Sequence, residues 1–165
     1  VSVAVNAWSL PDALYHCLKL SGSKLAIVDH ERSLLLAPLL KSLKESGCTE
    51  VYVVRTEKNN VPLGMHSFNA AVEGAKSMKK ESVDIVDEDN CCIFFTSGTT
   101  GLPKGVHSTQ RQYLTNTFLT AVSSTRALLR RGESIPAPDP TIARGLLLAT
   151  PLFHVTYVHN HLFSL

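Results

Sequence analysis

The sequence TSGTTGLPKG at residues 96–105 is the stretch that decides how the rest of this chain is interpreted. Its glycines and small hydroxyl side chains allow backbone N–H groups to approach an anion closely, and Lys104 adds one mobile positive charge. The apolar residues 91–95 just before it predict a buried strand, and helical spacing begins at about Thr109. We therefore predict a strand, a glycine-rich turn and a helix, an arrangement that captures phosphate groups.

Two common nucleotide-binding patterns do not fit this loop. A P-loop requires Gly, four further residues and then Gly-Lys-Ser/Thr, but Pro103 stands at the second glycine and Gly105 follows Lys104. The dinucleotide pattern Gly-x-Gly-x-x-Gly fails because Gly98, Gly101 and Gly105 are spaced differently. A surface loop without a ligand is the alternative, and the apolar strand directly before the loop favours phosphate binding over it.

The composition is that of an ordinary globular chain. A length of 165 residues suffices for one domain with a core, and 44% hydrophobic residues is an ordinary content. The net charge of +2 is too small to imply nucleic-acid or membrane binding. We find neither a signal-peptide pattern nor an apolar run of the roughly 18–20 residues that a membrane span needs. The cysteines lack zinc-like spacing and predict buried free thiols in a reducing compartment: Cys17, Cys48, Cys91 and Cys92.

Strand and helix patterns alternate along the chain. Strands are predicted at residues 1–5, 25–28, 51–54, 91–95 and 145–149. Helices are predicted from Pro11 to about Gly22, along a leucine stripe at residues 35–43 ending near Gly47, and at residues 68–80. Residues 57–64 and 130–141 read as loops, and the acidic residues 84–89 as a turn before a strand rather than a metal site. This order predicts an α/β fold with a mostly parallel sheet flanked by helices.

The chain resembles the adenylate-forming superfamily, which includes acyl- and aryl-CoA synthetases, coumarate–CoA ligases, luciferases and peptide-synthetase adenylation domains. Residues 93–106, IFFTSGTTGLPKGV, are similar to its phosphate-binding signature, and residues 151–155, PLFHV, to its next motif. Residues 3–11 and 21–29 are similar to an earlier segment of the same family. The resemblance implies that residues 1–165 are a partial AMP-binding domain, a fragment of the large N-terminal domain, with the C-terminal domain absent.

The family's functional residues carry over onto the two motifs. The resemblance implies that the loop residues surround the β- and γ-phosphates of ATP while Lys104 offsets their charge. Those residues are Thr96, Ser97, Gly98, Thr99, Thr100 and Gly101. It also implies that His154 lies beside the acyl pocket as a catalytic residue. We expect Trp8 and Phe153 to belong to the core or the pocket wall rather than to take part in the chemistry. Because ligands of open α/β sheets bind beyond the carboxyl ends of strands, we expect both motifs to face one crevice.

The implied reaction joins a small-molecule carboxylate to AMP and then to a thiol. ATP, Mg²⁺ and CoA are the implied cofactors, and a cytoplasmic or peroxisomal location is expected. Neither a nucleic-acid partner nor a membrane span is expected, and the sequence leaves the oligomeric state open. Two alternatives stay open: a non-catalytic remnant or phosphate-binding module without the adenosine site, and an unrelated kinase or NTPase with a divergent loop.

Overall fold

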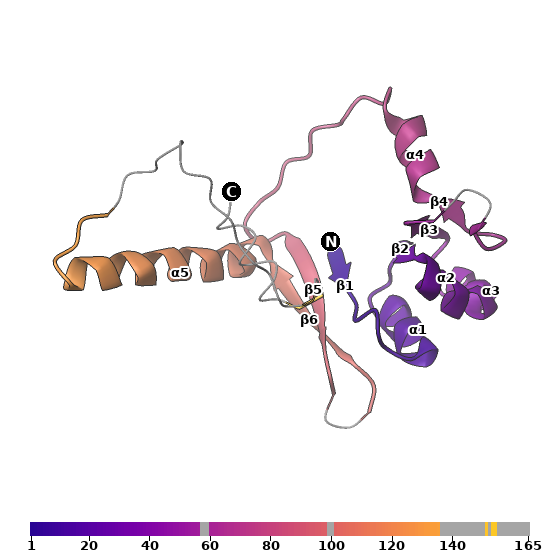
Figure 1. Cartoon of the computed structure of the whole chain (residues 1–165), viewed down its shortest axis with the longest axis horizontal. Helices are drawn as coiled ribbons and strands as arrows, with labels where there is room; N and C mark the ends of the chain where they lie inside the picture. The colour runs from indigo at the N-terminus through magenta and orange to yellow at the C-terminus, as the bar shows by residue number, and fades with distance from the viewer. Residues whose placement is uncertain (57–59, 99–100, 136–150, 152, 155–165) are drawn as a thin grey trace. The chain divides into compact units, whose positions relative to one another are not determined.

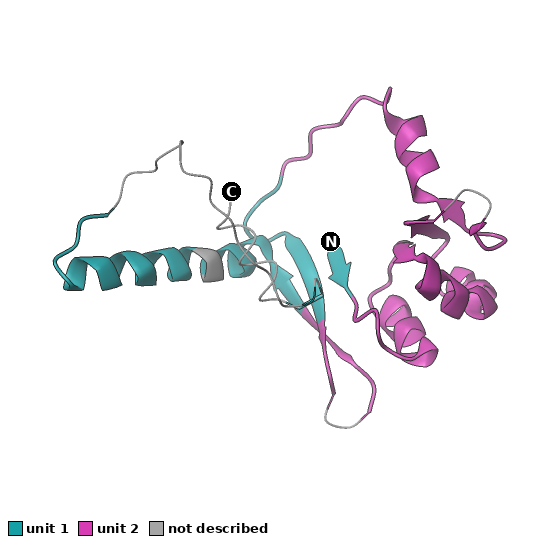
Figure 2. Cartoon of the chain, in the orientation of Figure 1, with its two compact units in different colours: residues 1–4, 85–94, 107–165 teal, residues 5–84, 95–106 magenta. Residues whose placement is uncertain are grey.

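The computed structural model describes residues 1–56, 60–98, 101–135, 151 and 153–154, apart from the side chains of residues 116 and 117. These residues fold into two compact units (Figure 2). One unit contains Val1–Ala4, Ile85–Phe94 and His107–Leu165, and the other contains Val5–Asp84 and Phe95–Val106. Within the described part of the chain, none of the helices has the length and apolar character needed to cross a membrane.

The unit formed by Val5–Asp84 and Phe95–Val106 contains a three-stranded parallel sheet (Figure 1). Its strands are β2 (Leu25–Asp29), β3 (Glu50–Val54) and β4 (His66–Ser67), in that order. The register places Ala26 opposite Val51 and Tyr52 opposite His66. Helix α1 (Pro11–Leu20) precedes β2, and helical segments connect β2 to β3, as a crossover between adjacent parallel strands requires. The predicted alternation of strand and helix is confirmed here.

The leucine-rich segment after β2 is divided into three pieces. Helix α2 (His30–Leu36) is followed by the 3₁₀ turn η1 (Ala37–Leu39) and by helix α3 (Leu40–Glu45). The prediction of one continuous helix was therefore wrong. Pro38 lies in the turn, and a proline cannot donate the backbone hydrogen bond of a helix interior and clashes with the preceding turn. The break still leaves Leu36 and Leu43 buried.

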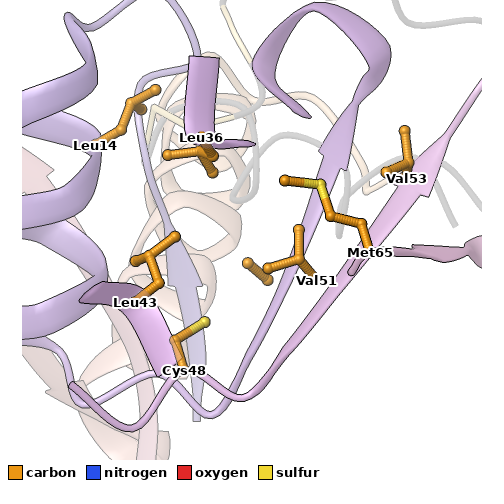
Figure 3. Close-up of a cluster of buried hydrophobic side chains, with 8 residues drawn as sticks. Leu14, Leu36, Leu43, Cys48, Val51, Val53 and Met65 are labelled. Atoms are coloured by element: carbon orange, nitrogen blue, oxygen red, sulfur yellow. The ribbon is translucent and has the colours of Figure 1, made fainter. Parts of the chain in front are cut away.

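A hydrophobic core lies between this sheet and its helices (Figure 3). Leu14 of α1, Leu36 of α2 and Leu43 of α3 face the strand residues Val51 and Val53. Ala26, Cys48 and Met65 complete the cluster. Burying one such large apolar side chain contributes roughly 1.5–3 kcal/mol, so this cluster is the main stabilising element of the unit.

Helix α4 (Phe68–Ala75) follows β4 and is capped by Ser67, whose hydroxyl accepts a hydrogen bond from the backbone N–H of Ala70. The prediction of a helix reaching residue 80 was wrong, since α4 ends at Ala75. Residues 76–84 are exposed throughout, so no apolar face packs to offset the entropy of extending a short helix. The basic residues in this stretch are Lys76, Lys79 and Lys80.

A second three-stranded sheet has the order β1 (Ser2–Ala4), β5 (Asn90–Thr96) and β6 (Lys104–Thr109). β1 and β5 are parallel, with Val3 opposite Ile93, and β5 and β6 form a hairpin (Figure 1). The 21-residue helix α5 (Gln110–Arg130) begins directly after β6. The predicted strand at residues 91–95 is confirmed, but the predicted strand–turn–helix order was wrong because β6 intervenes between the loop and α5.

Two pairs of contacts fix the start of α5. Thr109 is its N-cap: the Thr109 hydroxyl accepts from the backbone N–H of Gln112 at 3.3 Å, and the Gln112 side chain accepts from the backbone N–H of Thr109 at 3.0 Å. Arg111 forms salt bridges with Asp87 at 3.1 Å and Glu88 at 2.6 Å. The acidic segment therefore contains a turn that binds α5 next to β5, as its prediction as a turn before a strand anticipated.

The four cysteines are free thiols. Cys17, Cys48 and Cys92 are buried as predicted, whereas Cys91 is half-buried. Burial raises the pKa of the Cys17 thiol to about 11, and burial together with the neighbouring Cys91 raises the pKa of Cys92 to about 11. Trp8 does not belong to the core, because 69% of its surface is exposed.

Candidate phosphate-binding site

The candidate loop connects the two strands of the β5–β6 hairpin (Figure 1). At its base, the hydroxyl of Thr96 donates to the backbone carbonyl of Lys104 at 3.4 Å. Thr96, Ser97 and Gly101 are exposed, so their polar groups are accessible to a ligand. Thr99 and Thr100 lie outside the described residues, and their predicted part in phosphate binding stays a prediction.

Two glycines fit the loop for different reasons. A Cβ atom added to Gly98 would approach the carbonyl oxygen of Leu102 well inside 3.0 Å, a separation that real side chains do not show. Gly101 has a φ of +124°, which L-residues with a side chain rarely adopt. The loop therefore folds back on itself at Gly98, and it turns at Gly101, where the backbone is exposed and an added Cβ would meet no atom within 4 Å.

Lys104 is exposed and begins β6. The Cε atom of Lys104 lies 3.8 Å from the position that a Cβ of Gly98 would occupy, so the lysine stem runs beside the glycine. Lys104 forms no salt bridge with any other residue that the structure describes. A compact ammonium group next to bare backbone is suited to binding phosphate oxygens.

His16 is a residue of this site that the sequence did not predict. It lies on α1, and its Nε2 atom donates a hydrogen bond to the carbonyl oxygen of Pro103 at 3.1 Å. Because a carbonyl oxygen can only accept, the proton is on Nε2 of the imidazole. The two residues are 87 positions apart, and no motif in the sequence links them.

The second motif is described only at three residues. His154 is exposed, and its backbone N–H donates to the carbonyl oxygen of Pro151 at 3.0 Å, which indicates a turn. Phe153 is half-buried. The strand predicted at residues 145–149 and residue Val155 lie outside the described residues. Because His154 and Lys104 belong to different compact units, the expectation that both motifs face one crevice stays a prediction.

Comparison with known proteins gives one consistent result. The family model described as AMP-binding enzyme matches residues 1–165. The chain is 27% identical over 164 residues to 4-coumarate–CoA ligase 3 of Arabidopsis thaliana, covering 99% of this chain and 26% of that ligase. It is 26% identical over 162 residues to 4-coumarate–CoA ligase 2 of Narcissus pseudonarcissus, covering 94% of this chain and 26% of that ligase. The chain thus spans about a quarter of the length of these curated relatives.

Solved structures share the fold. The anthranilate–CoA ligase AuaEII in complex with anthranoyl-AMP matches with a TM-score of 0.59 at 24% identity, covering 74% of this chain and 22% of that one. A structure from Rhodopseudomonas palustris assigned to the long-chain-fatty-acid CoA ligases matches with a TM-score of 0.66 at 20% identity, covering 98% of this chain and 35% of that one. The family match over the full sequence argues against an unrelated kinase or NTPase, and the chain belongs to the AMP-binding, adenylate-forming enzyme family.

Proposed function

We propose that the complete protein activates a carboxylic acid with ATP and transfers the acyl group to the thiol of CoA. The observation that carries the proposal is the loop at residues 96–105. It combines the close backbone approach at Gly98, the exposed turn at Gly101 and the exposed side chain of Lys104. The 4-coumarate–CoA ligases that the chain resembles support CoA as the acceptor and an aryl or acyl carboxylate as the substrate.

The proposed reaction has two steps. A carboxylate oxygen attacks the α-phosphorus of ATP, the bond from that phosphorus to the bridging oxygen breaks, and pyrophosphate leaves. The CoA thiolate then attacks the carbonyl carbon of the acyl-adenylate, and AMP leaves with the electron pair of the carbon–oxygen bond. Both steps depend on holding the reactants in line and on offsetting the charge of the leaving phosphates.

We propose that the loop and Lys104 offset the charge of the leaving phosphates. Backbone N–H groups near Gly98 and Gly101 donate to the β- and γ-phosphates, with the hydroxyl groups of Thr96, Ser97, Thr99 and Thr100 beside them. The positive charge of Lys104 lies beside the leaving pyrophosphate and offsets its negative charge, which lowers the barrier to its departure. A salt bridge would compete for this lysine, and none with the described residues does.

We assign His154 to the acyl side of the same reaction. Its exposed side chain follows a turn at Pro151, and an imidazole at that place can bind the substrate carboxylate or the approaching thiol. We propose that Mg²⁺ would be held by the ATP phosphates together with water molecules, since Mg²⁺ sites in ATP-using enzymes combine substrate phosphates with waters and one or two carboxylates. When bound, it neutralises the phosphate charge that Lys104 also contacts.

Lys104 variants of the complete protein test the proposal. Pyrophosphate exchange into ATP is measured with a panel of carboxylates: 4-coumarate, anthranilate, a medium-chain and a long-chain fatty acid. We expect exchange that depends on one class of carboxylate, and we expect Lys104→Ala to lower kcat/KM for ATP by about tenfold or more, since a lost charged hydrogen bond costs roughly 1.5–3 kcal/mol. Lys19→Gln, which removes an exposed lysine of α1, is the charge-matched control.

Either of two results contradicts the proposal. If no carboxylate stimulates pyrophosphate exchange, the protein does not carry out the proposed adenylation reaction. If the wild-type protein activates a carboxylate and Lys104→Ala has the same kcat/KM, the reaction stands but the role proposed for Lys104 is wrong.

A further inference from the structure

We propose that His16 is a positioning residue for the phosphate-binding loop, which it holds through the peptide unit shared by Pro103 and Lys104. The inference rests on the proposed function insofar as it gives that loop a phosphate to bind. His16 contacts neither a substrate nor a reacting atom in this account. Its part is to fix the backbone from which the Lys104 side chain extends.

The hydrogen bond from His16 acts on the peptide unit that leads into Lys104. Nε2 of His16 donates to the carbonyl oxygen of Pro103 at 3.1 Å. That carbonyl belongs to the same planar peptide as the backbone nitrogen and Cα atom of Lys104. Holding the oxygen of a rigid peptide therefore limits the rotation of the whole unit, and the starting direction of the Lys104 side chain is limited with it.

The donor is carried by a well-anchored element. Helix α1 buries Leu14 and Cys17 in the core, with 5% and 1% of their surfaces exposed. Its C-terminus is closed by hydrogen bonds from the N–H groups of Ser21, Gly22 and Ser23 to carbonyls of the last turn, with Gly22 at φ +62°. A side chain on such a helix is placed more closely than one on a loop.

On the acceptor side the pairing of β6 with β5 begins at Lys104, and few of the described side chains hold the backbone before it. Pro103 has no N–H of its own, and the other described side-chain contact at this end of the loop is the long 3.4 Å bond from Thr96 to the Lys104 carbonyl. The half-buried imidazole of His16 is shielded in part from water, which strengthens a hydrogen bond relative to an exposed one. The contact from α1 is thus the stronger of these two side-chain restraints.

Two variants separate the hydrogen bond from the bulk of the side chain. His16→Leu keeps an apolar body and removes the donor, whereas His16→Gln keeps a donor N–H₂ at nearly the reach of Nε2. In the complete protein we expect His16→Leu to raise KM for ATP about fivefold with kcat within about twofold of wild type, as the loss of one hydrogen bond implies. We expect His16→Gln to restore most of the KM, and Lys19→Gln on the same helix to change neither constant.

Amide hydrogen exchange is a second measurement, and it does not depend on enzymatic activity. We expect faster exchange at Lys104, Gly105 and Val106 in His16→Leu, wild-type rates there in His16→Gln, and unchanged rates at the core strand residues Val51 and Val53 in both. Faster exchange at the core strand as well would mean a general loss of stability and would overturn the positioning role. So would an unchanged KM and unchanged loop exchange in His16→Leu.

Failure of the proposed function is distinguishable from failure of this inference. If the wild-type protein activates no carboxylate, the proposed function fails, and the loop exchange rates with and without ATP decide whether His16 positions a phosphate-binding loop. Protection of residues 104–106 by ATP in wild type, weakened in His16→Leu at the same ATP concentration, supports the inference in that case. Equal protection in both proteins overturns it.

Discussion

Gly98 and Leu102 are so close that the backbone carbonyl of Leu102 occupies the space where a side chain at Gly98 would begin. The loop between β5 and β6 is thus folded back onto its own backbone at this point. No other residue type fits at Gly98 without moving the carbonyl, and moving it displaces the segment that leads to Lys104.

Replacing this glycine tests whether the folded-back loop is the functional conformation. We expect Gly98→Ala to raise KM for ATP roughly tenfold, since relieving the clash costs about 1–3 kcal/mol of strain or loop displacement. Gly74→Ala is the matched control, because an added Cβ at Gly74 in α4 meets no atom within 4 Å. Steady-state kinetics of both variants is the measurement, and equal KM values would contradict the importance of the close approach.

The core of the sheet β2-β3-β4 offers a paired test of stability. Leu36 is 1% exposed and Leu34 is 55% exposed, although both lie on α2. We expect Leu36→Ala to lower the free energy of unfolding by about 2–5 kcal/mol and Leu34→Ala by less than about 0.5 kcal/mol. Urea denaturation compares the two, and similar losses would mean that the packing around α2 differs from the one described.

The start of α5 depends on the reciprocal bonds between Thr109 and Gln112. We expect Thr109→Ala to destabilise the helix by about 1 kcal/mol, the usual cost of losing an N-cap hydroxyl. Thr109→Ser keeps the hydroxyl and should stay close to wild type. Hydrogen exchange at the first turn of α5 detects the difference, and indistinguishable exchange in the two variants would argue against the cap.

Burial of Cys17 makes the stability of the fold sensitive to alkaline pH. Its pKa is raised from the ordinary 9.0 to about 11, so the folded protein holds the thiol proton more tightly than the unfolded chain does. The stabilisation is complete below pH 9 and is lost as the pH rises from about 9 to 11. We expect Cys17→Ala, although less stable at pH 7, to lose less stability over that interval. Parallel pH curves for both proteins would contradict this.

The spacing of apolar residues in the sequence predicted the helices and strands that have one buried face. Strands β2, β3 and β5 and helix α1 appear where apolar residues recur at the spacing of a strand or a helix. Strand β6 was missed because every residue from Lys104 to His107 is exposed, so no alternation of buried and exposed side chains marks it. The break at Pro38 is predictable from that proline, whereas the leucine stripe around it has the spacing of a continuous helix.

Some residues of the candidate site could be predicted from the sequence, and others could not. Thr96, Gly98, Gly101 and Lys104 form a local motif, so a single stretch of sequence predicts them. His16 acts on the loop from 87 residues away through one carbonyl, and contacts of that range are set by the tertiary fold. The sequence places His154 in a motif that follows the loop, and its position relative to the loop stays a prediction.

The products that the complete protein forms from ATP test the central claim most directly. With a matching carboxylate, CoA and Mg²⁺ present, the account predicts AMP and pyrophosphate in equal amounts together with the acyl-CoA, and no ATP consumption when the carboxylate is left out. Formation of ADP, or ATP consumption that does not depend on a carboxylate, would contradict it.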